Sequence, residues 1–198
     1  KASKKMSRVA SEGLVLAHEK EGEVSIIEIN SETDFVAKNK DFISFCKEIS
    51  EINFNKKGDL EKITSSNMKN NISVKDNLTD LISKIGEKIT LRRAKYFDKK
   101  EGNNFFYVHG AVEKNIGKII SVIKIKNIVK GKNEEIGAKL AMHIAASSPL
   151  AIDKNSLSKK VLEKELEIIK AELLNSGKKK EMIEKISQGK LNKFVSDN

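Results

Sequence analysis

Apolar and polar residues alternate along residues 11–30, and the polar turn Glu19–Gly22 interrupts the alternation once. A period of two is typical of strands that bury one face, so this segment predicts an antiparallel hairpin. The period then lengthens to spacings of three and four over Lys40–Phe54, which predicts a helix. The Asn- and Lys-rich stretch 55–75 is too polar to assign. The next expected elements are a helix over Leu78–Ile85, ended by Gly86, and a strand over Ile89–Phe97.

The second half of the chain repeats this order of elements. Strands are expected over Phe105–Val112 and Ile116–Ile125, paired through a turn at Glu113–Asn115. A helix is expected from about Asn133 to Ser147, with Ile136, Leu140 and Ile144 on one face. The two halves together predict an α+β fold of two related subdomains, each made of antiparallel strands packed with helices, over residues 1–100 and 101–156.

The last forty residues follow a different pattern. Apolar residues at spacings of 4, 3 and 4 form a short heptad seam, made of Leu162, Leu166, Ile169 and Leu173. Asn175–Gly177 breaks the seam, and an apolar stripe resumes from Met182 to Phe194. Residues 157–198 are therefore expected to form a protruding antiparallel helical hairpin, a coiled coil. Because the seam is short, it needs a partner or the core for stability, and self-association is one way to supply that partner.

Composition narrows the class of protein. The chain has 198 residues, 38% of them hydrophobic, and 38 basic against 28 acidic residues give a net charge of +10. Only Arg8, Arg92 and Arg93 are arginine, so the charge favours loose attraction to acidic partners more than base-specific recognition. One cysteine indicates a reducing compartment, and no apolar run approaches a membrane span. The start of the sequence also lacks the apolar segment of a signal peptide.

The sequence shows no arrangement that points to bond-making chemistry. No phosphate-binding glycine loop is present, and the nearest run, Gly131–Lys139, has the wrong spacing. The three histidines and the cysteine lie far apart, so neither a metal site nor a cofactor is expected, and the chain is not expected to be an enzyme. Cys46 lies on the apolar face of a predicted helix, where a buried structural thiol is the favoured interpretation.

The segment Asn30–Lys38 joins the second strand of the first hairpin to the helix that follows. Ser31 or Thr33 is suited to cap that helix, and Asp34 suits the positive end of the helix dipole. General rules leave two interpretations of Phe35 open. Either its ring staples the turn onto the core, or it serves a partner.

The residues Asn30–Lys38, NSETDFVAK, closely resemble the T-D-F-V signature of bacterial elongation factor Ts. Further segments resemble the same family in the same order along the chain. They are Lys4–Gly13 (K-K-x-x-R-x-A-x-E-G), Gly86–Arg93 (G-E-x-x-x-x-R-R), Tyr107–Gly110 (Y-x-H-G), Ile116–Gly117 (I-G), Leu140–Ser147 (A-M-H-[IV]-A-A), and Ser176–Lys178 with Gly189–Lys190 in the hairpin.

The resemblance implies a function in translation elongation. Members of this family are guanine-nucleotide exchange factors for the GTPase elongation factor Tu, which they bind in its GDP-bound and nucleotide-free forms. The resemblance assigns the dislocation of magnesium to Thr33, Asp34, Phe35 and Val36, and other partner contacts to Ile116, Gly117, Met142 and His143. It implies that the chain does not bind nucleotide itself and does not associate with a membrane. It also implies a location in the cytoplasm or an organelle matrix.

Two features of the family have no counterpart in these 198 residues: a small N-terminal helical domain with a T-G-A-G segment, and a strand that returns from the coiled coil. The sequence is therefore expected to be part of the family's full length. The competing hypothesis is a lysine-rich RNA-binding or ribosome-associated module. It explains the charge but not the ordered motifs, and the aromatic residues fall mostly at core positions rather than on a stacking platform.

Overall fold

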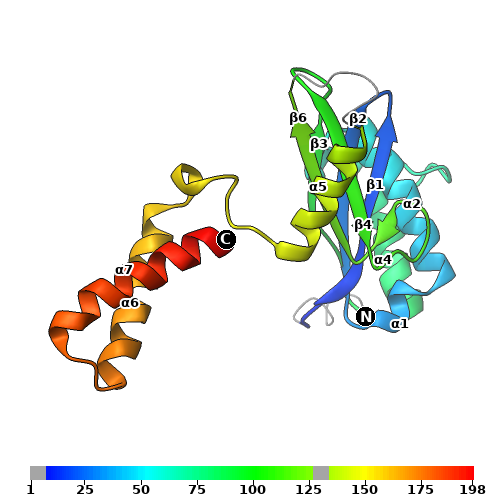
Figure 1. The fold of residues 1–198 in the computed structure, drawn as a ribbon. Helices are drawn as coiled ribbons and strands as arrows, with labels where there is room; N and C mark the ends of the chain where they lie inside the picture. The colour runs from blue at the N-terminus through cyan, green and yellow to red at the C-terminus, as the bar shows by residue number, and fades with distance from the viewer. Residues whose placement is uncertain (1–7, 127–133) are drawn as a thin grey trace. The chain divides into compact units, whose positions relative to one another are not determined.

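A computed structural model describes residues 8–126 and 134–198 of the chain, which divide into two compact units (Figure 1). One unit runs to Ala145, and the other is Ala146–Asn198. Helices combine with antiparallel sheets, so the α+β class is confirmed. The subdomain boundaries near residues 100 and 156 stay predictions. No helix in either described stretch is long and apolar enough to cross a membrane.

The first unit is built on an antiparallel sheet of four strands in the order β3-β2-β1-β5. The predicted hairpin is confirmed as β1 (Glu12–Lys20) and β2 (Glu23–Ser31), and β3 (Ile89–Phe97) has the predicted bounds. Glu21 and Gly22 both have positive φ at the hairpin turn, the backbone that matches the twist of two adjacent strands. Alternation along β1 and β2 sends Leu14, Leu16, Ile27 and Ile29 into the core.

Four helices complete this core: α1 (Asp34–Ala37), α2 (Lys40–Asn55), α3 (Leu60–Ser65) and α4 (Val74–Ile85). The side chain of Asn39 caps α2, and Gly86, with φ of 90°, ends α4 as predicted. Helix α3 was not predicted, because Ile63 is its one buried residue and a single apolar position sets no period.

The three strands β4, β5 and β6 that follow β3 belong to two sheets. β4 (Asn103–His109) pairs with β6 (Ile119–Ile125), which confirms the pairing predicted for this part of the chain. The expectation of one strand over Ile116–Ile125 is wrong, because β5 (Ile116–Gly117) pairs instead with β1 in the first sheet. A Cβ atom on Gly117 would lie 2.7 Å from the carbonyl oxygen of His109. This close approach explains the glycine where the chain changes sheets.

Helix α5 (Glu134–Ser147) packs through its small residues. A Cβ atom on Gly137 would lie 2.3 Å from the Phe105 ring, and Ala141 is fully buried. The apolar face of the helix is not the one that packs, because Ile136 and Leu140 are 56% and 42% exposed. The predicted start at Asn133 lies outside the described residues.

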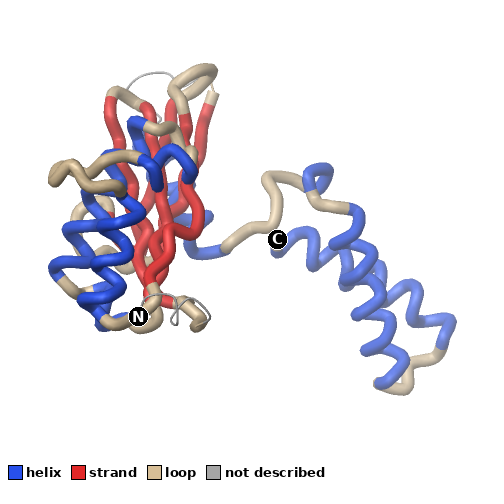
Figure 2. The backbone as a smooth tube through the Cα atoms, turned by 180° about the vertical axis from the view of Figure 1, so that it is seen from behind, coloured by secondary structure: helices blue, strands red, loops and turns tan. Residues whose placement is uncertain are grey.

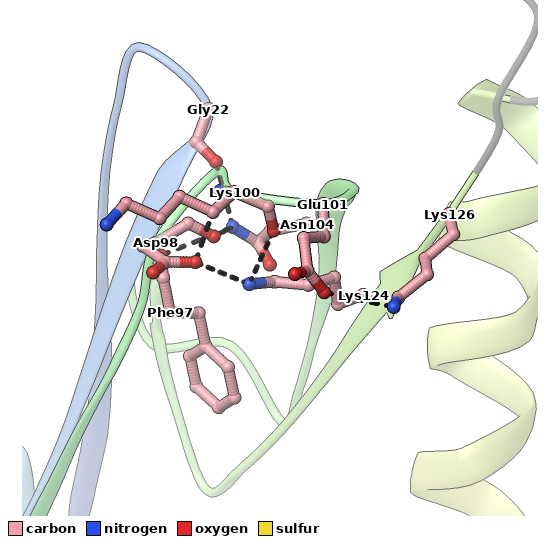
Figure 3. Close-up of polar contacts among 8 residues, drawn as sticks. All are labelled: Gly22, Phe97, Asp98, Lys100, Glu101, Asn104, Lys124 and Lys126. Carbon is pink, nitrogen blue, oxygen red and sulfur yellow. Dashed lines mark hydrogen bonds and ion pairs between the residues drawn. The ribbon is translucent and has the colours of Figure 1, made fainter.

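The side chain of Asn104 joins the two sheets at the end of the unit that holds the β1–β2 turn (Figure 3). Its amide nitrogen lies 2.9 Å from the Gly22 carbonyl oxygen, 3.2 Å from that of Phe97 and 2.8 Å from that of Asp98. Beside it, Lys124 of β6 contacts the Asp98 carboxylate at 2.6 Å, and this hydrogen bond lowers the pKa of Asp98. β3 and β6 are thus tied where both end.

In the second unit, a short 3-10 helix (Lys154–Ser156) leads into α6 (Lys159–Asn175), which a turn at Gly177 connects to α7 (Lys180–Asp197) (Figure 2). Ile169 and Leu173 of α6 are buried with Ile183 of α7. Ion pairs Lys170–Glu184 and Lys190–Glu172 flank this small core. The two predicted helices are confirmed, whereas coiled-coil geometry stays a prediction.

Candidate functional site

The segment Thr33–Val36 holds the N-cap residue Thr33 and most of the single turn of α1, which follows the end of β2 closely. Val36 and Ala37 are buried in the core and anchor the turn, whereas Phe35 is 79% exposed. The interpretation that Phe35 staples the turn onto the core is therefore wrong, because Val36 does so. Asp34, the neighbour of Phe35, is half exposed and contacts Lys38 at 3.2 Å.

The N-terminal end of this turn is fixed by a contact that the sequence did not predict. The backbone N–H of Thr33 donates to Glu87 Oε2 at 3.0 Å, and Thr33 Oγ1 donates to Glu87 Oε1 at 2.8 Å. In return, the N–H of Lys88 donates to Glu32 Oε1 at 2.6 Å. Of the two residues expected to cap the helix, Thr33 stands at the N-cap of α1, but its side chain makes no cap bond, and Ser31 Oγ donates to the Thr33 carbonyl oxygen.

Elsewhere in the sheet, the largely buried carboxylate of Glu28 in β2 is held by two consecutive arginines of β3. Arg92 Nη1 lies 2.7 Å from one carboxylate oxygen, and Arg93 Nε lies 2.5 Å from the other. A β-bulge between Glu28 and Ile29 leaves Arg92 as the extra residue of β3, so both arginines reach the same carboxylate. Burial alone would raise the pKa of Glu28, but hydrogen bonds from Arg92, Arg93 and Asn30 outweigh burial and lower it.

A second candidate surface lies on α5. Met142 and His143 are both exposed there, on a helix fixed by Gly137 and Ala141. The other two predicted residues are not exposed. Ile116 and Gly117 are buried in β5, the short strand that pairs with β1. Partner contact by Ile116 and Gly117 stays a prediction.

The two exposed surfaces lie toward the same end of the first unit. β2 runs from the β1–β2 turn down to α1, and α5 runs in the same direction after β6, so the C-terminal turns of α5 and α1 lie away from that turn (Figure 1). The sequence motifs for both surfaces were identifiable, but the contact of Glu87 with Thr33 and the pairing of Glu28 with the two arginines were missed. Their one signal was the G-E and R-R positions in Gly86–Arg93.

The remaining candidate groups are structural. Cys46 is fully buried in the core, and burial raises the pKa of its thiol. Within residues 8–126 and 134–198, no group of three or more His, Cys, Asp or Glu side chains is arranged to hold a metal ion.

The described residues thus form an α+β scaffold with an exposed Phe–carboxylate pair on α1 and an exposed face on α5. The family model described as Elongation factor TS matches residues 32–198, so the chain belongs to the elongation factor Ts family.

Curated relatives agree with this assignment over the whole chain. Elongation factor Ts of Paracoccus denitrificans is 38% identical over 198 residues, covering 100% of this chain and 65% of the relative. The Maricaulis maris protein is 35% identical over 100% of this chain and 64% of the relative. The Rickettsia bellii protein is 35% identical over 99% of this chain and 64% of the relative. The chain thus spans about 64–65% of the length of these relatives.

Proposed function

We propose that this chain is a guanine-nucleotide exchange factor that acts on elongation factor Tu during translation elongation. It binds the GTPase in its GDP-bound and nucleotide-free forms and promotes GDP release by disturbing the magnesium and phosphate site. The observation that carries the proposal is the exposure of Phe35, at 79%, on a turn whose neighbours Val36 and Ala37 are buried. An exposed ring on an anchored turn has no role in the fold and suits insertion into a partner.

The chemistry of the turn suits a GTPase. GDP is held by phosphate contacts and by a magnesium ion that bridges phosphate oxygens. Phe35 has the bulk to displace packed apolar side chains, and Asp34 has the charge to disturb polar groups around the metal. Tighter binding to the nucleotide-free GTPase weakens GDP binding by the same factor, because the two equilibria are linked.

Contacts from α5 complete the proposed interface. Met142 and His143 give it an exposed thioether and an imidazole. Ile116 and Gly117 would contribute contacts from β5. The chain itself binds no nucleotide in this proposal and needs no cofactor. Its role places it where translation occurs, in the cytoplasm or an organelle matrix. Self-association through α6 and α7 stays a separate prediction.

The test is GDP release from elongation factor Tu loaded with a fluorescent GDP. Phe35→Ala and His143→Ala should each slow release by roughly tenfold or more at limiting exchange factor, the loss typical of a central contact residue. Ile152→Ala is the matched control, since Ile152 is 99% exposed and is assigned no role. Unchanged release with both site variants, at intact folding, contradicts the proposal.

The RNA-binding alternative predicts the opposite pair of results. An RNA-binding module would bind RNA with a steep dependence on salt concentration and leave GDP release unchanged. Both measurements use the same protein preparation, so one experiment separates the two functions.

A further inference from the structure

We propose that Glu87 is a positioning residue that fixes the direction of Phe35, an inference that rests on the proposed exchange function. Glu87 lies 54 positions beyond Thr33 in the sequence, yet its carboxylate accepts both the N–H and the hydroxyl of Thr33. Glu32, one residue before Thr33, accepts the N–H of Lys88, one residue after Glu87. The end of β2 and the start of β3 are thus joined by a reciprocal pair of contacts.

The need for this pair follows from the length of α1. A helix of four residues has too few internal hydrogen bonds to hold its own shape, and its first N–H groups have no partners inside it. Thr33 is the N-cap residue but makes no side-chain cap bond. Glu87 takes over that role with a charged acceptor, and hydrogen bonds to ionised groups are the stronger kind.

Phe35 lies between two fixed points. On its C-terminal side Val36 and Ala37 are buried, and on its N-terminal side Thr33 is held by Glu87. With the Glu87 contact removed, the turn would keep one fixed point and the exposed ring would sample more directions. A side chain that is already held in the direction it has in the complex loses less conformational entropy on binding. GDP release at limiting exchange factor is therefore faster.

The backbone around Glu87 aims the carboxylate at Thr33. Gly86 ends α4 with φ of 90°, and β3 begins two residues after Glu87. Arg8 supports the second contact, the one between Glu32 and Lys88, because Arg8 Nη1 lies 3.4 Å from Glu32 Oε2. Both carboxylates therefore act from positions set by regular elements.

The first measurement needs no partner. Glu87→Ala should raise the hydrogen-exchange rate of the Thr33 amide by roughly tenfold, because the amide loses its acceptor. Glu87→Gln should stay close to the parent, since its amide oxygen still accepts from the Thr33 N–H and its amide nitrogen can donate to Thr33 Oγ1. Glu61→Ala, in the exposed first turn of α3, is the control.

The second measurement is GDP release from elongation factor Tu at limiting exchange factor, with all variants shown to be folded by circular dichroism. Glu87→Ala should slow release by roughly three- to tenfold, and Glu87→Gln should restore it. Thr33→Val keeps the shape and removes only the hydroxyl donor, so an intermediate loss is expected. This variant also serves if Glu87→Ala fails to fold.

The outcomes are distinct. If the hydrogen-exchange rate of the Thr33 amide is unchanged in Glu87→Ala, the positioning role is overturned. It is also overturned if Glu87→Ala leaves GDP release unchanged while Phe35→Ala slows it. If Phe35→Ala and His143→Ala both leave release unchanged, the exchange function fails, and the hydrogen-exchange rate of the Thr33 amide alone then decides whether Glu87 fixes the turn.

Discussion

At the scale of single residues, one inserted position explains the use of two arginines. Consecutive side chains of a strand normally point to opposite faces, so Arg92 and Arg93 would not meet in a regular β3. The bulge opposite Glu28 changes this, and both guanidinium groups share one carboxylate. Because both arginines are mostly exposed, the carboxylate is the member of the cluster that depends on the contact.

Glu28→Gln should lower the free energy of unfolding at neutral pH by about 2 kcal/mol, the scale of a charge-assisted hydrogen bond. The folded-state pKa of Glu28 lies below its usual value of 4.5, so its stabilisation is present above pH 4.5 and is lost as the pH falls through the folded-state pKa. The parent and the variant should therefore converge in acid.

Urea denaturation at a series of pH values checks this expectation. Glu19→Gln, an exposed residue of β1, is the control and should follow the parent throughout. A difference between Glu28→Gln and the parent that stays constant into acid would contradict the assignment of the stabilisation to the ionised carboxylate.

At the scale of elements, α5 marks the limit of what hydrophobic periodicity predicts. The pattern predicted the existence of this helix and its end at Ser147, but its apolar face is not the face that packs. Periodicity weighs large apolar residues, whereas α5 packs through Gly137 and Ala141, whose small side chains allow close approach. Large residues such as Ile136 are thereby left on the surface.

The candidate site divides in the same way. Its residues on α1 and α5 were predictable, because motifs are read along one continuous segment. The exposure of Phe35 and the support from Glu87 were not, because each depends on a tertiary contact. The contact between Thr33 and Glu87 spans 54 positions, and nothing in the local pattern of either segment records it.

Gly137→Val should displace α5, because a Cβ atom there would overlap the Phe105 ring. We expect a loss of about 1–3 kcal/mol in the free energy of unfolding, as for other overpacked positions, together with slower GDP release through the shift of His143. Gly189→Ala is a matched control in α7, where nothing lies within 4 Å, and it should stabilise slightly. Chemical denaturation and GDP release measure both effects, and an unperturbed Gly137→Val would refute the packing argument.

At the scale of the whole molecule, several contacts join the two sheets of the first unit, and two groups of them involve hydrogen bonds or ion pairs of side chains. In one, β5 pairs with β1 and Lys118 contacts Glu12 at 2.8 Å. In the other, Asn104 holds the carbonyl oxygens at the β1–β2 turn and at the end of β3. The Asn104 contacts oppose rotation of the second sheet about the β5–β1 pairing, and α5 packs on that second sheet through Phe105.

Asn104→Ala should therefore weaken cooperation between the two contact surfaces without altering either. In the parent background, Phe35→Ala and His143→Ala should be coupled in a double-mutant cycle of GDP release, because both surfaces bind at once. In the Asn104→Ala background this coupling should fall toward zero. Asn103→Ala, the exposed neighbour in β4, is the control and should leave the coupling intact. Equal coupling in all three backgrounds would exclude this role for Asn104.

The burial of Cys46 has a practical consequence for such work. Thiol reagents react with the thiolate, and this cysteine is both shielded by α2 and the sheet and raised in pKa. A cysteine introduced on the surface can therefore carry a label while the native one stays unmodified. In the unlabelled protein, a thiol reagent can modify Cys46 only when the core opens. The rate of this modification therefore reports how often the core opens.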